Sequence, residues 1–301
     1  MEHEILKLIV EHGPLTGSEL WETLGCDPLP LWQACRCSEK LAFTAVGTRY
    51  LRLDRRVEGY ARLSPSILRE FLTYTVVGEA DHADALSRRA GELRTHTEDI
   101  SRTKLDTAYR IASGLEACSE ILQDTEREVC FIIAGDIVYN MAHDVPRPER
   151  STGKPVNGSD MDMVVVVDDQ MPKEVMERLD NEIYREKIRI LMAPGIREEI
   201  DYVVKPVKKI REQLRFERFR HMVACKILRE GTFLFGTERL FRRVKDMLRE
   251  SGVSDRLTAL ESRARDFRAD AEAYLLKVDS ERFGEKDHQL FYPSEESEEF
   301  E

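Results

Sequence analysis

Long apolar runs and a basic leader are both missing from this sequence of 301 residues. No stretch approaches the roughly 20 apolar residues that span a bilayer, and residues 1–4 lack the cationic start of a secretory signal. Cysteine is also scarce: six are scattered along the chain, and only Cys35 and Cys37 lie close together. Without a second pair at metal-ligand spacing, a zinc site is not expected. We therefore expect a cytoplasmic protein with free thiols and no membrane segment.

The charge is acidic overall but unevenly distributed. The net charge is −11, which argues against a general nucleic-acid binder. Residues 205–249 nevertheless hold 14 Lys and Arg against 5 Asp and Glu. Residues 281–301 are acidic and poor in apolar side chains, so we predict a disordered tail there.

The N-terminal residues predict a small helical module. Apolar residues at helical spacing precede Gly13, which ends a first helix. Thr16 and Glu19 have the spacing of a capping box, which predicts a second helix over Gly17–Leu24. A third helix is expected over residues 31–41.

Two short strands, over residues 43–46 and 49–53, are then expected around a tight turn at Gly47-Thr48. This order of elements resembles winged helix-turn-helix domains, with the third helix in the recognition position. That resemblance implies a nucleic-acid contact through exposed basic residues, namely Arg36, Lys40, Arg49 and Arg52. A protein-docking or dimerisation module is the alternative interpretation.

A helical connector is expected over residues 61–128. One helix should cover residues 63–77, with Ser64 as its cap. Residues 81–128 contain no proline and carry an apolar stripe at alternating spacings of three and four. The stripe indicates either a homodimer or packing within the chain, on one long helix or two joined helices. Its members are Leu86, Ala90, Leu93, Thr97, Ile100, Ala108, Ile111, Leu115, Cys118 and Leu122.

The pattern becomes strand-like after residue 128. An apolar strand over Val129–Ala134 is followed by a helix and then by a polar loop over residues 144–158. Residues 159–167 alternate acidic and apolar side chains before a run of valines, and further strands are expected over 188–192 and 199–204.

Three aspartates in this region point to a metal site. Asp160 and Asp162 are two residues apart, so in a strand they share one face, and Asp201 would lie on a neighbouring strand. Carboxylates held this close repel each other unless a divalent cation binds between them. The three carboxylates therefore predict a Mg²⁺ or Mn²⁺ site, in the arrangement that activates a hydroxyl and stabilises a pyrophosphate leaving group.

This region resembles the DNA polymerase β-like nucleotidyltransferase superfamily, in its minimal type. The likeness rests on Ile133-Ala-Gly135, on Gly158-Ser-Asp-Met-Asp162 and on Ile200-Asp-Tyr202, and it spans about residues 129–240. It implies an α+β fold, with a small mixed sheet flanked by helices. It also implies transfer of an NMP from an NTP to an acceptor hydroxyl on RNA or protein, with Asp160, Asp162 and Asp201 catalytic. Nucleotide contacts would come from Gly135, Asp136, Gly158 and Ser159.

Asp136 departs from the pattern of this superfamily. A small residue normally follows the glycine and lets backbone N–H groups bind the triphosphate, whereas a carboxylate repels it. Residues 151–154 and the basic segment 205–249 are the alternative sources of phosphate contacts. Two other classes stay open: a catalytically silent DNA-binding regulator, and an antitoxin-like component acting on a partner protein.

The expected organisation has five parts. They are a winged-helix-like module over 1–60, a helical connector over 61–128, a nucleotidyltransferase core over 129–250, a helix over 251–280 and a tail over 281–301.

Overall fold

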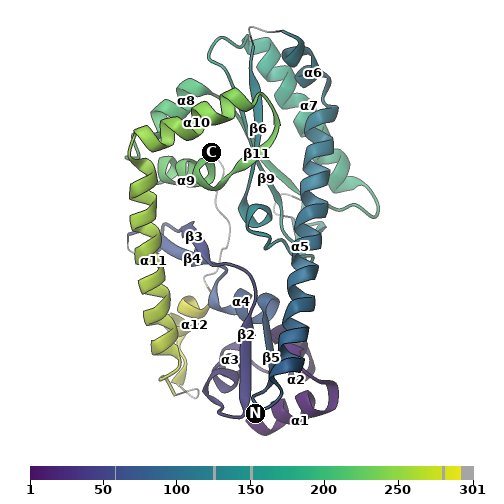
Figure 1. Ribbon diagram of the computed structural model, residues 1–301, viewed down its shortest axis with the longest axis vertical. Helices are drawn as coiled ribbons and strands as arrows, with labels where there is room; N and C mark the ends of the chain where they lie inside the picture. The colour runs from purple at the N-terminus through teal and green to yellow at the C-terminus, as the bar shows by residue number, and fades with distance from the viewer. Residues whose placement is uncertain (58, 125–126, 150–151, 280–281, 293–301) are drawn as a thin grey trace. The chain divides into compact units, whose positions relative to one another are not determined.

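The computed structural model describes residues 1–57, 59–124, 127–149, 152–279 and 282–292, with helices and small sheets in both halves of the chain (Figure 1). The described chain divides into two compact units. The first unit comprises residues 1–96 and the described part of 260–298, and the second comprises residues 97–259. The expected connector is therefore split, since residues 61–96 belong to the first unit and 97–128 to the second.

The first unit begins with three helices, close to the expectation from sequence. They are α1 (Glu2–His12), α2 (Gly17–Leu24) and α3 (Pro28–Cys37). The capping box of α2 is confirmed: the N–H of Glu19 donates to Thr16 Oγ1 over 3.2 Å, and the N–H of Thr16 donates to Glu19 Oε2 over 2.7 Å. The predicted end of the third helix is wrong, because α3 stops at Cys37 and Leu41 begins a strand.

A three-stranded antiparallel sheet packs with these helices. It consists of β1 (Leu15–Thr16), β2 (Leu41–Ala45) and β5 (Thr75–Glu79), in the order β1-β5-β2. The predicted hairpin at Gly47 is wrong, because β2 pairs with β5 and β3 (Tyr50–Leu53) pairs with β4 (Ala61–Ser64). Residues 46–74 thus form an insertion between the two long strands of the sheet.

The helix expected over residues 63–77 is much shorter in the structure. Helix α4 spans Ile67–Tyr74, and its N-cap is Ser66, whose hydroxyl accepts the N–H of Arg69 over 3.2 Å. Ser64 lies in β4, and Val77 lies in β5. The apolar residues of the segment 63–77 therefore belong to three elements, β4, α4 and β5, and not to one helix.

The C-terminal part of the chain packs back into the first unit. Helix α11 spans Val253–Leu275, and helix α12 spans Glu285–Phe291. Phe291 is buried in the first core beside Trp32, with 5.6 Å between ring centroids. The predicted tail is therefore wrong for residues 285–291, where one aromatic side chain anchors a short helix. Residues 293–301 lie outside the described part of the chain.

Helix α5 (Ala83–Gly114) is continuous through its middle and breaks at Leu115, where α6 (Glu116–Gln123) begins. The stripe is largely covered by the chain itself. Leu86 and Ala90 are buried in the first unit, and Ala108, Ile111, Leu115 and Cys118 are buried in the core of the second. Packing within the chain, which was one of the two interpretations, therefore accounts for most of the stripe. The stripe then no longer gives a reason to expect a dimer. Leu122 is exposed.

The second unit is built around a four-stranded mixed sheet. Its strands are β6 (Val129–Ala134), β9 (Met161–Val167), β10 (Ile200–Pro206) and β11 (Thr232–Gly236), in the order β10-β9-β6-β11. Strands β9 and β10 are parallel, and the other two pairs are antiparallel. The α+β class and the small mixed sheet are as expected.

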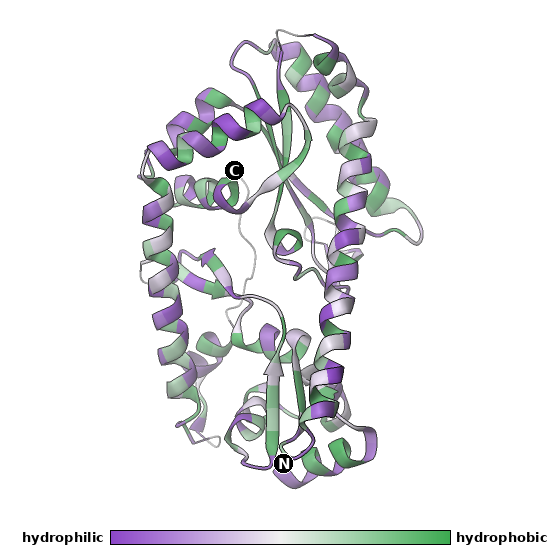
Figure 2. Cartoon of the chain, in the orientation of Figure 1, coloured by the Kyte–Doolittle hydropathy of each residue, from purple (hydrophilic) through white to green (hydrophobic). Residues whose placement is uncertain are grey.

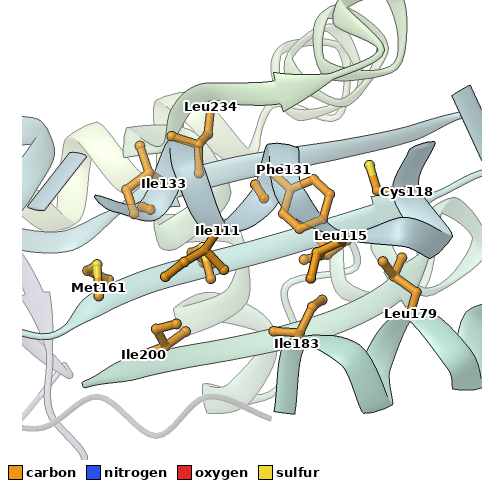
Figure 3. Close-up of a cluster of buried hydrophobic side chains, with 14 of the residues drawn as sticks. Ile111, Leu115, Cys118, Phe131, Ile133, Met161, Leu179, Ile183, Ile200 and Leu234 are labelled. Carbon is orange, nitrogen blue, oxygen red and sulfur yellow. The ribbon is translucent and has the colours of Figure 1, made fainter. Parts of the chain in front are cut away.

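Helices cover both faces of this sheet (Figure 1). One face packs against α5, α6 and α7 (Lys173–Met192), through alternate strand residues such as Phe131, Met161 and Ile200 (Figure 3). The other face packs against α8 (Val207–Gln213), α9 (Phe219–Glu230) and α10 (Glu238–Glu250). The strand predicted over residues 188–192 is wrong, because that segment is the last turn of α7.

Two smaller elements precede β9. A 3₁₀ helix, η1 (Gly135–Tyr139), follows β6 in place of the longer helix expected there. The predicted loop contains a short hairpin of β7 (Pro146–Pro148) and β8 (Pro155–Asn157). Among the described residues, no helix combines the length and apolarity required to cross a membrane.

Candidate metal centre

The three predicted aspartates meet at one end of the β9–β10 pair. Asp162 and Asp201 are direct partners in the parallel register, so their side chains leave the same face of the sheet. Asp160 immediately precedes β9. One carboxylate oxygen from each of Asp160, Asp162 and Asp201 lies within 4.8 Å of the other two, and all three residues are half-buried. The predicted convergence of these carboxylates is confirmed.

A fourth acid, Glu199, was not predicted. The N–H of Met161 donates to the carbonyl of Glu199 over 2.9 Å, which continues the β9–β10 pairing to the level of Asp160. Two acid-x-acid segments therefore lie side by side, Asp160-Met-Asp162 and Glu199-Ile-Asp201. The second segment repeats the spacing of the first, and that repetition was the signal in the sequence that would have identified Glu199.

Two cations neutralise part of this cluster. Arg147, on β7, places Nη1 2.9 Å from Glu199 Oε2 and Nη2 3.5 Å from Asp160 Oδ2, and it donates from Nε to the carbonyl of Gly158 over 2.8 Å. Lys187, on α7, donates to Asp201 Oδ1 over 3.0 Å. Neither was predicted, because Arg147 lies in a segment taken for loop and Lys187 precedes one taken for a strand.

The crowding of negative charge changes the acidity of two carboxyls. Burial raises the pKa of Asp160, and the carboxylates of Asp201 and Asp136 raise it further, while Arg147 opposes the shift. Burial also raises the pKa of Glu199, with a smaller contribution from Asp160 and again against Arg147. Because a raised pKa means that the charged form is disfavoured, the cluster gains from any further positive charge.

The predicted nucleotide-binding residues lie beside the aspartates. Gly135 adopts a φ of +72°, and a Cβ there would come within 2.1 Å of Asp162 Oδ2, so only glycine fits against the carboxylate. Gly158 has a φ of +64°, and its Cβ would lie 1.8 Å from the carbonyl oxygen of His143. Both glycines therefore permit the close approach of the turns that carry Asp136 and Asp160.

Carboxylates already interact with the groups where phosphate contacts were expected. Ser159 donates its hydroxyl to Asp136 Oδ2 over 2.6 Å and accepts the N–H of His143 over 3.2 Å. The N–H of Gly135 donates to Glu230 Oε1 over 3.3 Å, and the carboxylate of Glu230 also accepts from Tyr139 and pairs with buried Lys226. Glu230, at the end of α9, was not predicted.

Several of the alternative phosphate contacts proposed from sequence lie away from the aspartates. Thr152 bonds to Glu149, and Lys154 reaches Met192 Sδ, while Ser151 lies outside the described residues. In the basic segment, Arg211 pairs with Asp169 and Arg239 pairs with Glu128. Those two acids flank the opposite end of the strands, beyond Val167 and before Val129.

The four basic residues assigned to the winged module have different surroundings. Arg36 and Lys40 are exposed, and the Arg36 guanidinium lies 4.7 Å from the centre of the Phe43 ring. Arg49 makes two 2.7 Å bonds to Glu70 and one of 2.9 Å to Glu272, and Arg52 is only 8% exposed. The placement of Arg49 and Arg52 on an exposed wing is therefore wrong, since both belong to the inserted segment and its packing.

No protein-family model, curated protein or solved structure matches this chain. The chemistry of the site must accordingly be argued from its residues.

Proposed function

We propose that the second unit is a metal-dependent nucleotidyltransferase that moves an NMP from an NTP to an acceptor hydroxyl on a macromolecule. The observation that carries this proposal is the meeting of Asp160, Asp162 and Asp201 on adjacent parallel strands, with oxygens within 4.8 Å of one another. The mixed sheet between two helical layers and the resemblance of residues 129–240 support it.

The donor set fits Mg²⁺ or Mn²⁺. Both are hard cations that take oxygen ligands, and Mg²⁺ usually binds one or two carboxylates together with substrate phosphates. Asp160 and Asp162 would hold both ions of a two-metal site, and Asp201 would hold the ion on the acceptor side. When bound, such ions polarise the phosphoryl group and neutralise the charge that develops on the leaving pyrophosphate. Asp201 would accept the proton of the acceptor hydroxyl.

Arg147 and Lys187 have a defined role in this proposal. They neutralise the carboxylates that would ligate the ions, so the incoming charge competes with them for Asp160 and Asp201. Both cations would then be available to a triphosphate bound at the metal site and could compensate for the charge of Asp136. Arg147 would stay beside the site through its contacts with Glu199 and Gly158.

A second candidate function is supported by the interactions of Glu230 and Asp136. The carboxylate of Glu230 accepts the hydrogen bond from the N–H of Gly135, and the carboxylate of Asp136 places a negative charge at the start of η1. Both interactions oppose triphosphate binding at that turn. A catalytically silent regulator, which keeps the fold as a sensor or scaffold, is the function that these contacts favour.

The first unit would act as a recognition module. Its helices and its β1-β5-β2 sheet have the order of a winged helix, if β5 rather than β3 supplies the second strand of the wing. One side of α3 is covered, however: Gln33 donates to the carbonyls of Leu275 and Val278, and Trp32 packs on Phe291. This arrangement favours docking over insertion of α3 into a DNA groove.

The test is incubation of the protein with each α-³²P-labelled NTP, Mn²⁺ or Mg²⁺, and either total RNA or cell extract. Covalent label on a macromolecule, lost in Asp162→Asn and retained in the control Asp106→Asn on the exposed side of α5, is the expected result. The absence of transfer from all four NTPs, in a protein that binds Mn²⁺, would favour the silent regulator.

A further inference from the structure

We propose that the exposed face of α8 and α10 is a binding surface for the phosphate backbone of a single-stranded RNA acceptor. The inference deepens the proposed function by naming its acceptor class. It rests on a charge distribution that the carboxylate site does not use.

The basic segment is exceptional in this chain. Residues 205–249 carry an excess of nine positive charges within a protein of net charge −11. Most of them face solvent: ten basic residues in the segment are exposed, against three acidic ones. The exposed bases are Lys208, Lys209, Arg211, Arg215, Arg218, Arg220, Arg239, Arg242, Arg243 and Arg249.

Part of this surface is hollowed and bordered by arginines. An open cavity of about 810 Å³ is lined by Arg211 of α8 and by Arg239, Arg242 and Arg243 of α10. Three acids and one methionine of α10 line it as well, namely Glu238, Asp246, Glu250 and Met247. Hydrophilic residues recur along α10, while its apolar residues Leu240, Val244 and Leu248 are buried (Figure 2). Guanidinium groups present several donors in one plane, which suits bidentate contact with phosphate oxygens.

The acidic neighbours of these arginines do not cancel the positive charge of the surface. Arg211 pairs with Asp169, Arg239 with Glu128 and Arg242 with Glu238, all in exposed or partly exposed positions. Ion pairs of this kind contribute little to stability and weaken with salt. A phosphate can therefore replace the carboxylate at low cost. Burial opposes the charge of Asp169, but the hydrogen bonds from Arg211 and Lys208 lower the pKa of that carboxyl, and the charge of Arg243 lowers it further.

The position of the surface favours a polymer over a mononucleotide. Asp169 and Glu128 mark the end of the sheet opposite the aspartates. The seven residues of β9 separate these ends by roughly 20 Å at about 3.3 Å per residue. A chain several nucleotides long can reach from the arginines to the carboxylates, whereas one nucleotide cannot.

Single-stranded RNA is favoured over an acidic protein by the kind of cation and by the shape of the site. The four arginines of the hollow outnumber its three acids, and its one apolar lining residue, Met247, is half-buried, so the hollow suits a repeating phosphate better than an apolar anchor. An acidic protein would be expected to use apolar contacts as well.

The experiment measures binding of a fluorescent 20-nucleotide polyuridylate without metal or NTP, across a salt series. The triple variant Arg239→Ala, Arg242→Ala, Arg243→Ala is compared with the control Arg102→Ala, Arg110→Ala, Arg185→Ala. The three control arginines are exposed on α5 and α7, in the helical layer on the other face of the sheet. Their substitution removes the same amount of positive charge as the triple variant does. Because alanine has the highest helix propensity, both triple substitutions should leave the helices folded.

We expect the wild type and the control to bind alike at about 50 mM salt. The triple variant should lose at least about tenfold in affinity, and its salt slope should fall by roughly two units for three lost contacts. Unchanged affinity and slope in the triple variant, or no RNA binding by the wild type, would overturn the proposal. Equal binding of poly-glutamate by the wild type would overturn it in favour of an acidic protein.

Binding in the Asp162→Asn variant separates this proposal from the catalytic one. If that variant binds RNA normally but transfers no label, both proposals stand. If the wild type binds RNA but neither Mn²⁺ nor NTP, the surface stands and the proposed catalytic function fails.

Discussion

Lys187 of α7 donates to Asp201 of the edge strand β10 over 3.0 Å, so a helix that packs on one face of the sheet supplies a cation to the carboxylate cluster. Asp201 is also the direct register partner of Asp162. The ammonium therefore occupies a position from which it competes with a divalent ion for one carboxylate and can also attract a phosphate.

Lys187→Met should affect these two ligands in opposite directions. Loss of the competing ammonium should tighten Mn²⁺ binding by about threefold to tenfold, because about 0.7 to 1.4 kcal/mol of charge compensation is removed from Asp201. Affinity for a non-hydrolysable NTP analogue should fall by at least about tenfold. Isothermal titration of each ligand provides the measurement, with Lys173→Met at the exposed start of α7 as control. Equal changes for both ligands would contradict the assigned role.

Asp136→Ser tests the departure from the nucleotidyltransferase pattern. The substitution removes a carboxylate that accepts from Ser159 and that raises the pKa of Asp160. We expect NTP affinity to increase by about tenfold, since a repulsive charge leaves the turn at Gly135, and Mn²⁺ affinity to decrease slightly. Equilibrium binding of a labelled NTP analogue measures the effect. Weaker binding of the analogue would mean that Asp136 supports the nucleotide site.

The sequence predicted those parts of the fold in which local signals agree with tertiary packing. The capping box of α2, the valine-rich strand β9 and the shared face of Asp160 and Asp162 follow from short local patterns in the sequence. Strand pairing was harder to predict from the sequence. Strand β2 pairs with β5 across an insertion of about thirty residues, and no local signal encodes that pairing.

The remaining errors at the site have a common physical cause. Arg147 and Lys187 reach the aspartates, and Glu230 reaches the turn at Gly135, only through the packing of β7, α7 and α9, which no local pattern in the sequence encodes. Residues 188–192 read as a strand because a buried helical turn and a short strand have similar composition. Only Glu199 was recoverable, from its spacing to Asp201.

Lys205→Met tests the electrostatics of the core. Lys205 is buried on β10, its ammonium donates to Gln213 Oε1 over 3.1 Å, and burial lowers its pKa to about 8. Below pH 8 the folded protein retains a disfavoured charge, so the apolar variant should be more stable at pH 7 by about 1–3 kcal/mol.

The advantage should shrink between pH 8 and 10.5. Over that range the folded wild type releases a proton that the unfolded chain keeps, so wild-type stability rises with pH. Urea unfolding at pH 7 and pH 10 measures the difference, with Lys208→Met on the exposed side of α8 as control. A less stable variant at pH 7 would show that the bond to Gln213 outweighs the burial of the charge.

Arg36→Ala with Lys40→Ala tests whether the first unit contacts duplex DNA. Both residues are exposed, but neighbouring positions of α3 are covered by the C-terminal segment. We expect at most about a threefold change in binding to genomic fragments in gel shifts at low salt. A loss of more than tenfold, with a salt slope reduced by about two units, would establish α3 as a DNA-binding helix and contradict the docking interpretation.

The central claim is that Asp160, Asp162 and Asp201 form a divalent-metal site, and Mn²⁺ titration followed by electron paramagnetic resonance tests it most directly. We predict saturable binding to the wild type and to Asp106→Asn, and at least about a hundredfold weaker binding to Asp162→Asn. The thermal midpoint of Asp162→Asn should be preserved or raised, because the substitution relieves repulsion between neighbouring carboxylates. Equal Mn²⁺ affinity in Asp162→Asn and the wild type, or no saturable binding by the wild type, would contradict the claim.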